Sequence, residues 1–183
     1  MEIGRTLYVS NRKAWRAWLV KNHAAKKEIW LVYPNAHTGK RRIPYNDAVE
    51  EALCYGWIDS IIKKLDHNRS AQRWSPRRSS KSFLSETNKE RVRRMIRAGL
   101  MTPAGLKNIQ TRMDEKFVPS SDILVALKRD PQAWKNFRAF PEWYQRIRVG
   151  WIDGARHRPE VFQQRLRYLL KMTAQNKRFG MIR

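Results

Sequence analysis

The stretch WIDSIIKKLDHNRSAQRWS, residues 57–75, decides the fold class of this chain. Residues 57–65 are rich in β-branched and aromatic side chains, which favours a strand. Residues 66–68 predict a polar turn, and residues 69–75 predict an antiparallel strand that returns beside the first. The run KKEIWLVY, residues 26–33, is also apolar and β-prone and predicts a further strand. We therefore expect a small antiparallel sheet in the N-terminal half.

Helical patterns surround these strands. The first helix begins after a capping residue, Ser10 or Asn11, and ends near Asn22. A second helix is expected at about 46–55, and a third at 85–98 with Val92, Met95 and Ile96 facing inward. Proline residues near the starts of later segments favour further helices, which we place at 103–113, 122–129, 131–139, 141–153 and 159–175. The expected fold class is α+β, with helices packed on the sheet and a helical C-terminal part.

The same patterns predict how the chain is divided. Residues 1–115 are expected to form the α+β domain, including a basic loop and helix. Residues 116–122 contain Pro119 and two serines and are expected to form a linker. Residues 123–183 are expected to form a helical, basic region that packs on the first domain.

Composition limits the class of protein. The chain has 183 residues, of which 42% are hydrophobic and eight are Trp, enough for a folded core. A single cysteine excludes an internal disulfide. No apolar run approaches the ~20 residues that span a bilayer, and the N-terminus lacks the apolar block of a signal peptide. We therefore expect a cytoplasmic protein with no membrane span.

Positive charge is the most unusual property of the sequence. It contains 39 Lys and Arg against 16 Asp and Glu, a net charge of +23. Residues 60–100 carry twelve basic and three acidic side chains, and residues 128–183 carry fourteen and four. Solvated faces on an ordinary enzyme explain part of this excess, but solubility needs a net charge of only about 2–8. An anionic partner explains the excess better.

The arginines of the expected helix 85–98 are the clearest candidates for phosphate contacts. Three of them lie on one stripe and would repel one another unless an anion lies alongside. Guanidinium groups bind phosphate, and a tryptophan can stack on an unpaired base. The alternative is a tryptophan in the core and solvated arginines. The candidate anion-binding residues are Arg73, Trp74, Arg77, Arg78, Lys81, Arg93, Arg94, Arg97, Arg158 and Arg165.

Other chemical motifs are weaker. The segment AHTGKRR, residues 36–42, lacks the first glycine and the final Ser or Thr of a P-loop and predicts a basic turn. The four histidines lack ligand spacing, so we expect no metal site and no cofactor. Cys54 lies among core positions, which favours an inert thiol over a nucleophile. Glu50, Glu51 and Asp59 suit either acid/base chemistry or ion pairs with arginines, and ion pairs are favoured in so basic a chain.

Several ordered segments together resemble a known family. They are Trp15–Leu19, Asn22–His23, Glu51–Ser60, Gln72–Arg78, Asn88–Val92, Gly99–Leu106 and Trp151–Ala155. Over most of the chain they resemble the YdeI/OmpD-associated family, also labelled bacteriocin-protection proteins. The chain departs from the family at Ser70, where an aromatic residue is usual, and at Leu84, where Trp is usual.

The resemblance implies a bacterial α+β protein connected with stress response and bacteriocin tolerance. If the family has a pocket, the matching positions here are His23, Trp57, Asp59, Arg73 and Arg77. The alternative is that the segment around Asp59 is simply the buried start of a strand.

The leading hypothesis is a non-enzymatic, basic binding protein that engages nucleic acid. RNA, or a ribonucleoprotein such as the ribosome, is favoured over DNA because the sequence contains no recognised DNA-reading motif; another polyanion is the broader possibility. One alternative is a stress or bacteriocin-tolerance factor that acts through a protein or an envelope component. A second alternative is a small enzyme with a pocket near His23, Asp59 and Arg77.

Overall fold

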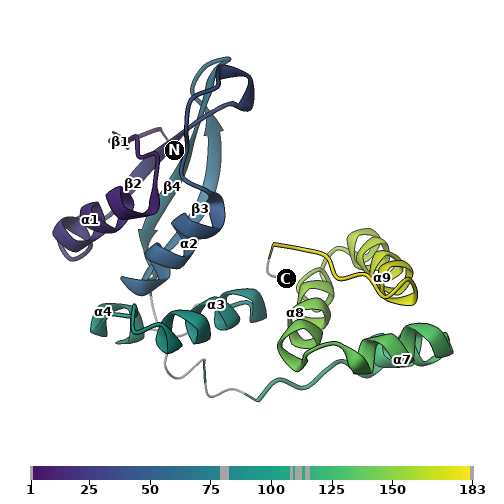
Figure 1. Ribbon diagram of the computed structural model, residues 1–183. Coiled ribbons are helices and arrows are strands. Elements are labelled where there is room, and N and C mark those ends of the chain that lie inside the picture. Colours follow the sequence, from purple (N-terminus) through teal and green to yellow (C-terminus); the bar gives the residue numbers. More distant parts are fainter. Residues whose placement is uncertain (1, 79–82, 108, 110–112, 114–115, 182–183) are drawn as a thin grey trace. The chain divides into compact units, whose positions relative to one another are not determined.

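The computed structural model describes residues 2–78, 83–107, 109, 113 and 116–181 (Figure 1). The fold is α+β, as the sequence predicts, with the strands in the N-terminal half and helices in the C-terminal part. The chain divides into two compact units, which are described separately. The N-terminal unit comprises residues 1–82 and 92–114, and the C-terminal unit comprises residues 83–91 and 115–183.

Four strands form a mixed sheet in the order β1-β2-β4-β3. The pairs β2–β4 and β4–β3 are antiparallel, as predicted; these strands are β2 (Ile29–Pro34), β3 (Trp57–Lys64) and β4 (Arg69–Pro76). The edge strand β1 (Thr6–Leu7) pairs with β2 in parallel, and the expectation of a purely antiparallel sheet misses it. A strand of two residues is too short to leave an alternating pattern in the sequence.

Short helices complete the N-terminal unit. They are α1 (Arg12–Asn22), the 3₁₀ helix η1 (Ala36–Thr38), α2 (Tyr45–Cys54), α4 (Pro103–Lys107) and the second half of α3 (Glu86–Arg97). The first of these begins where the sequence predicts, because the side chain of Asn11 accepts a hydrogen bond of 2.9 Å from the backbone N–H of Ala14. The boundary between the two units falls within α3.

The inward face of α3 is partly as expected. Val92 and Met95 are buried, but Ile96 is 46% exposed, so its predicted inward orientation is wrong. The helix turns by about 100° per residue, and only one of two adjacent positions can face the core fully. Helix α4 ends at Lys107. The predicted helix continued to residue 113, but residues 108 and 110–112 lie outside the described residues, as do residues 114 and 115 after it.

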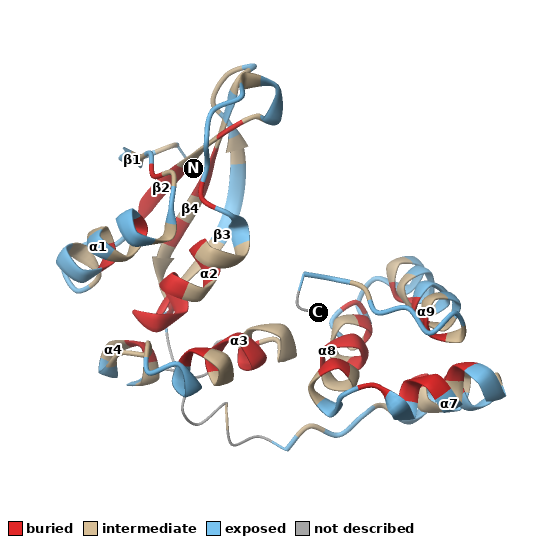
Figure 2. Cartoon of the chain, in the orientation of Figure 1, coloured by how far each residue is buried: buried red, intermediate tan, exposed pale blue. Residues whose placement is uncertain are grey.

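Tryptophans form the centre of the N-terminal core. The ring of Trp15 stacks on that of Trp18 at 5.3 Å between centroids and meets Trp74 edge-on at 5.8 Å, and Trp18 meets Trp57 edge-on at 5.5 Å. The indole N–H of Trp15 donates to the carbonyl of Ala48 at 3.0 Å. Figure 2 shows the buried residues of this unit on the strands and on α2. Much of the tryptophan content therefore serves packing.

From residue 116 to residue 181, the C-terminal unit contains four helices, which match the four predicted ones. They are α6 (Ser121–Lys128), α7 (Pro131–Ala139), α8 (Glu142–Asp153) and α9 (Pro159–Ala174). The side chain of Asp130 caps α7 by accepting hydrogen bonds from two backbone N–H groups at 3.0 Å. Apolar residues from all four helices share one core, including Ile123, Leu127, Phe137, Ile152, Phe162 and Leu169.

Candidate anion-binding surfaces

Two arginines of α1 are held inside the N-terminal unit by carboxylates of α2. Glu51 is 1% exposed and accepts hydrogen bonds from Nε of Arg12 and from Nη1 of Arg16, the latter at 2.7 Å. Glu50 accepts a hydrogen bond of 2.8 Å from Nη1 of Arg12. Arg16 also donates to the backbone carbonyl of Leu100 at 2.9 Å. The predicted structural role of Glu50 and Glu51 is confirmed, and these two arginines belong to the fold.

Three of the predicted anion-binding residues on and after β4 are too buried or already paired to contact a nucleic acid. Trp74 has no exposed surface, so its indole cannot stack on a base. Arg77 is 6% exposed, and the side chain of Arg73, 15% exposed, forms an ion pair of 2.7 Å with Glu28. We therefore remove these three residues from the candidate surface. Arg78, two residues past the end of β4, is exposed and stays among the candidates.

The arginines of α3 support an anion-binding surface less well than the sequence suggests. Arg93 and Arg94 are half-buried and Arg97 is exposed. All three take part in interactions within the protein, so we do not base a binding surface on them. Lys81, the remaining candidate near this helix, lies outside the described residues.

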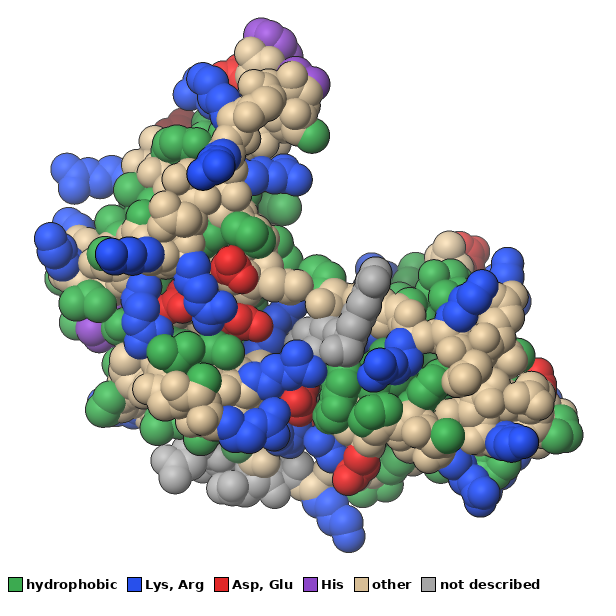
Figure 3. All heavy atoms as spheres, in the orientation of Figure 1, with side chains coloured by type: hydrophobic (Ala, Val, Ile, Leu, Met, Phe, Trp, Pro, Cys, Tyr) green, Lys and Arg blue, Asp and Glu red, His purple; other side chains and the backbone are tan. Residues whose placement is uncertain are grey.

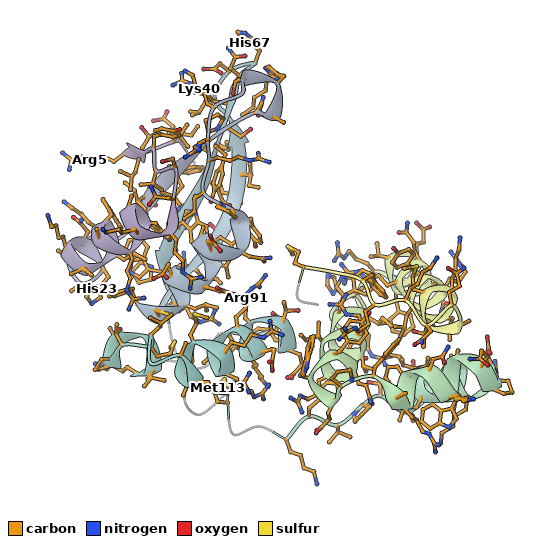
Figure 4. All side chains as sticks on the ribbon, viewed as in Figure 1. Arg5, His23, Lys40, His67, Arg91 and Met113 are labelled. Atoms are coloured by element: carbon orange, nitrogen blue, oxygen red, sulfur yellow. The ribbon has the colours of Figure 1, made fainter. Side chains whose placement is uncertain are left out.

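Exposed cations gather at one end of the sheet. Lys40, Arg41 and Arg42 are consecutive and exposed in the segment between η1 and α2, and Lys64 is exposed at the end of β3. Figure 4 shows Lys40 at the same end of the sheet as His67, in the turn between β3 and β4. Within the described part of the chain, none of these four cations forms an ion pair with a carboxylate. We call these four residues the tip cluster.

The sequence predicts a basic turn that contains three residues of the tip cluster, but it does not identify that turn as a binding surface. Residues 36–42 were expected to form a basic turn, and the structure places η1 there, but the segment was not assigned to the interface. The available signal was the run of three basic residues after Gly39, which adopts a left-handed conformation with φ of 64°. Lys64 joins them through strand pairing, because it lies opposite Ser70, which in turn lies opposite Tyr33 at the end of β2.

The C-terminal unit has an exposed basic stripe on α9. Gln163, Arg167 and Lys171 are exposed and spaced by four residues, so they follow one line on the helix surface. Arg158, a predicted contact, is exposed directly before the helix. Arg165 is half-buried, because its guanidinium lies 4.7 Å from the ring centre of Trp151 and donates to the carbonyl of that residue. We call Arg167 and Lys171 the α9 stripe.

Other arginines of the C-terminal unit are committed to its fold. Arg148 is 5% exposed, and its guanidinium lies 5.2 Å from the ring centre of Tyr144 and 4.8 Å from that of Phe179. Arg156 pairs with Asp122 at 2.8 Å and with Asp153 at 2.7 Å. Figure 3 shows Lys and Arg side chains spread over the visible face of each unit, where they outnumber Asp and Glu.

The residues of the expected family pocket have structural partners. A ring nitrogen of His23 lies 2.9 Å from a backbone carbonyl of its own helix, and the backbone carbonyl of His23 accepts a hydrogen bond from the indole of Trp57. Asp59 Oδ2 accepts hydrogen bonds from Tyr45 Oη at 2.9 Å and from Gln72 Nε2 at 2.7 Å. These partners give no support to an enzyme pocket shared by His23, Asp59 and Arg77.

Metal and thiol chemistry receive no support from the described residues. They contain no group of three or more His, Cys, Asp or Glu side chains that could hold a metal ion. Burial raises the pKa of Cys54 to about 11, which disfavours the thiolate that a nucleophile needs. As far as the helices are described, none is long and apolar enough to cross a membrane.

Fold and charge together define the class: a basic protein in which an α+β unit is joined to a helical unit. Residues 7–108 match the family described as "Domain of unknown function (DUF8412)", more than half of the chain, and the chain belongs to that family. Residues 117–176 match the family described as "Bacteriocin-protection, YdeI or OmpD-Associated". No curated protein and no solved structure matches the chain.

The second match confirms the expected family and locates it. It covers α6 to α9, including the predicted segment Trp151–Ala155. The N-terminal segments that also suggested this family, among them Glu51–Ser60, fall within the part of the chain that matches the other family. The resemblance over most of the chain is therefore divided between two adjacent family models.

Proposed function

We propose that this protein binds nucleic acid, with RNA favoured over duplex DNA, in the cytoplasm. The observation that carries the proposal is the set of exposed cations in the tip cluster and the α9 stripe, which have no carboxylate partner among the described residues. Cations placed in this way can contact phosphates and release the counterions bound to them, which is the main source of nucleic-acid affinity.

The internal use of the carboxylates supports this proposal. Glu28, Glu50 and Glu51 pair with arginines that are partly buried in the N-terminal unit. Asp122 and Asp153 both pair with Arg156 in the C-terminal unit. These five of the 16 acidic residues neutralise arginines within the fold, and the exposed cations of the tip cluster and the α9 stripe have no such partner among the described residues. A structured RNA or a ribonucleoprotein such as the ribosome would provide a matching phosphate surface.

The test is fluorescence anisotropy with a labelled RNA hairpin and a duplex DNA of equal length. One variant carries Lys40→Gln, Arg41→Gln and Arg42→Gln, and another carries Arg167→Gln and Lys171→Gln. The matched control carries Lys13→Gln and Lys21→Gln on the exposed side of α1. We expect each test variant to lose about tenfold or more in RNA affinity, and the control to lose about twofold or less.

Two results would overturn the proposal. One is the absence of RNA binding by the unaltered protein at low salt. The other is an equal loss of affinity in the control and the test variants, because a diffuse effect of net charge would then explain the binding without any particular surface. Equal affinity for the RNA hairpin and the duplex DNA would contradict the preference for RNA.

A second candidate function is protection against bacteriocins, which the family description of residues 117–176 favours. Under this proposal the C-terminal unit acts through a protein or an envelope component in a stress response. The test compares bacteriocin sensitivity of a deletion strain with that of the strain restored by the full chain. Higher sensitivity of the deletion strain, reversed by the chain, is expected; unchanged sensitivity would contradict the proposal.

A further inference from the structure

A cavity of about 340 Å³ lies beside the tip cluster in the N-terminal unit. Its lining includes Tyr33, Ser70 and Gln72 of the sheet, Arg42 from the segment that leads into α2, and Tyr45, the first residue of α2. This volume is within the range of small-molecule sites, about 300–1,000 Å³. The lining combines aromatic rings with a few polar groups and one cation, which is typical of a ligand pocket.

Strand pairing explains why these side chains face the cavity together. Gln72 lies opposite Leu31 and Ser70 lies opposite Tyr33 in the β2–β4 pair, so all four are on one face of the sheet. A β-bulge between Asp59 and Ile62 places Asp59 opposite Trp74 and Ile62 opposite Gln72 on that same face. The bulge therefore brings a carboxylate behind the cavity wall and an apolar side chain to its rim.

Asp59 fixes two of the lining side chains. Its Oδ2 atom accepts hydrogen bonds from Tyr45 Oη at 2.9 Å and from Gln72 Nε2 at 2.7 Å. Gln72 is 3% exposed, and among the described residues the bond to Asp59 is the one hydrogen bond of its side chain. Its carbonyl oxygen and its second N–H are therefore left for a ligand, and the bond to Asp59 determines which way they point.

The side-chain amide of Gln72 presents one hydrogen-bond acceptor beside one donor, and this pair is complementary to adenine. Gln and Asn bind adenine through this pair, because adenine presents an amino donor next to a ring-nitrogen acceptor. The rings of Tyr33 and Tyr45, with Ile43 and Pro44, supply the apolar surface on which a planar base packs. Arg42 is an exposed cation in the cavity lining and can pair with a phosphate.

We infer that this cavity binds one unpaired adenine nucleotide, with the base on Gln72 and the phosphate on Arg42. The inference rests on the proposed function, because the adjoining tip cluster would hold the neighbouring phosphates of the same strand. The same chemistry is present in free AMP and in an unpaired adenosine of an RNA, and the experiment separates these two sources.

The experiment uses the full chain and two series of probes. Isothermal titration compares AMP, adenosine and UMP, and fluorescence anisotropy compares labelled single-stranded oligo(A) with oligo(U). We expect AMP and oligo(A) to bind about tenfold more tightly than their uridine counterparts, the typical effect of one bidentate base contact. Gln72→Leu should abolish this preference for adenine.

A second variant does not depend on a buried position. Arg42→Gln alters an exposed side chain and should weaken AMP about tenfold while leaving adenosine unchanged, because adenosine has no phosphate. Lys13→Gln, on α1, is the matched control and should leave both ligands unchanged. An equal loss for AMP and adenosine in Arg42→Gln would contradict the placement of the phosphate.

The outcomes separate this inference from the proposed function. If RNA binds but adenine and uridine probes bind equally, the adenine site is overturned and the proposed function stands. If AMP binds and no RNA does, the proposed function is overturned, and the cavity is a site for a free nucleotide. Binding of oligo(A) without binding of AMP would contradict the cavity, because the contacts must then lie on the strand outside it.

Discussion

Glu51 illustrates how a single side chain in this protein serves two cations. Its carboxylate is nearly inaccessible to solvent and bridges Arg12 and Arg16, which themselves keep about a third of their surface, 33% and 29%. Removing one member of a buried ion pair leaves the remaining charges without compensation. The arginines of α1 thus depend on Glu51 for their placement against α2.

We predict that Glu51→Gln lowers the free energy of unfolding by about 2–4 kcal/mol, because Arg16 loses its carboxylate partner and Arg12 loses one of its carboxylate partners. Glu50→Gln is the matched control: the same change on the same helix, at a side chain 18% exposed whose one ion pair among the described residues is with Arg12. It should cost about 1 kcal/mol or less. Urea unfolding followed by tryptophan fluorescence measures both values. Equal losses would contradict the special role of Glu51.

Cys54 provides a prediction about reactivity. Burial raises its pKa to about 11, so at pH 8 nearly all of the thiol remains protonated in the folded protein. We expect the native chain to react with a maleimide at about one hundredth of the rate of the urea-unfolded chain, where the pKa returns to about 8.5. Comparable rates in the two states would show that Cys54 is accessible and would contradict its assignment as an inert thiol.

At the scale of elements, α4 rests closely on the end of α2. The backbone carbonyl of Cys54 accepts hydrogen bonds from the N–H and the hydroxyl of Thr102, at 3.2 and 2.6 Å. A Cβ atom on Gly105 would lie 2.3 Å from that same carbonyl oxygen. The glycine is thus required by the close approach of the two backbones.

Gly105→Ala should therefore destabilise the N-terminal unit by about 3 kcal/mol, the upper part of the range for overpacked sites. Gly154→Ala is the control, because its φ of −61° suits alanine and the nearest atom to a Cβ there lies at 3.4 Å. It should change stability by about 0.5 kcal/mol or less. Thermal unfolding monitored by circular dichroism distinguishes the two. A neutral Gly105→Ala would mean that α4 does not pack as described.

Local patterns predicted most elements, because the information they need lies within one segment. The cap at Asn11, the hairpin of β3 and β4 and the four C-terminal helices follow from residues that are neighbours in the sequence. Edge strand β1 could not be predicted in this way. Its two residues have a strand conformation only because they pair with β2.

The candidate site was less predictable, since it depends on pairing between distant segments. Arg73 and Trp74 are adjacent, yet one pairs with Glu28 and the other lies against Trp15 in the core. No local pattern specifies these partners. The cavity near Gln72 depends on the bulge that aligns β3 with β4. The residues of this bulge include no glycine or proline from which it could be predicted. The net charge, by contrast, follows directly from the amino-acid counts.

At the scale of the whole molecule, the two units contribute to one electrostatic property. Each has internal arginines neutralised by carboxylates, and each has exposed cations without such partners in its described part. The protein is therefore expected to bind phosphate polymers through several separate phosphate contacts. Such binding weakens steeply with salt, because every contact releases counterions.

The most direct test of nucleic-acid binding is a salt titration of RNA affinity. With about five phosphate contacts to a single strand, the logarithm of the association constant should fall with log[salt] at a slope of about −3.5, or roughly 100-fold between 50 and 200 mM salt. The variant carrying Lys40→Gln, Arg41→Gln and Arg42→Gln should have a slope shallower by about 2. An affinity that changes by less than about twofold over the same range would contradict the electrostatic account.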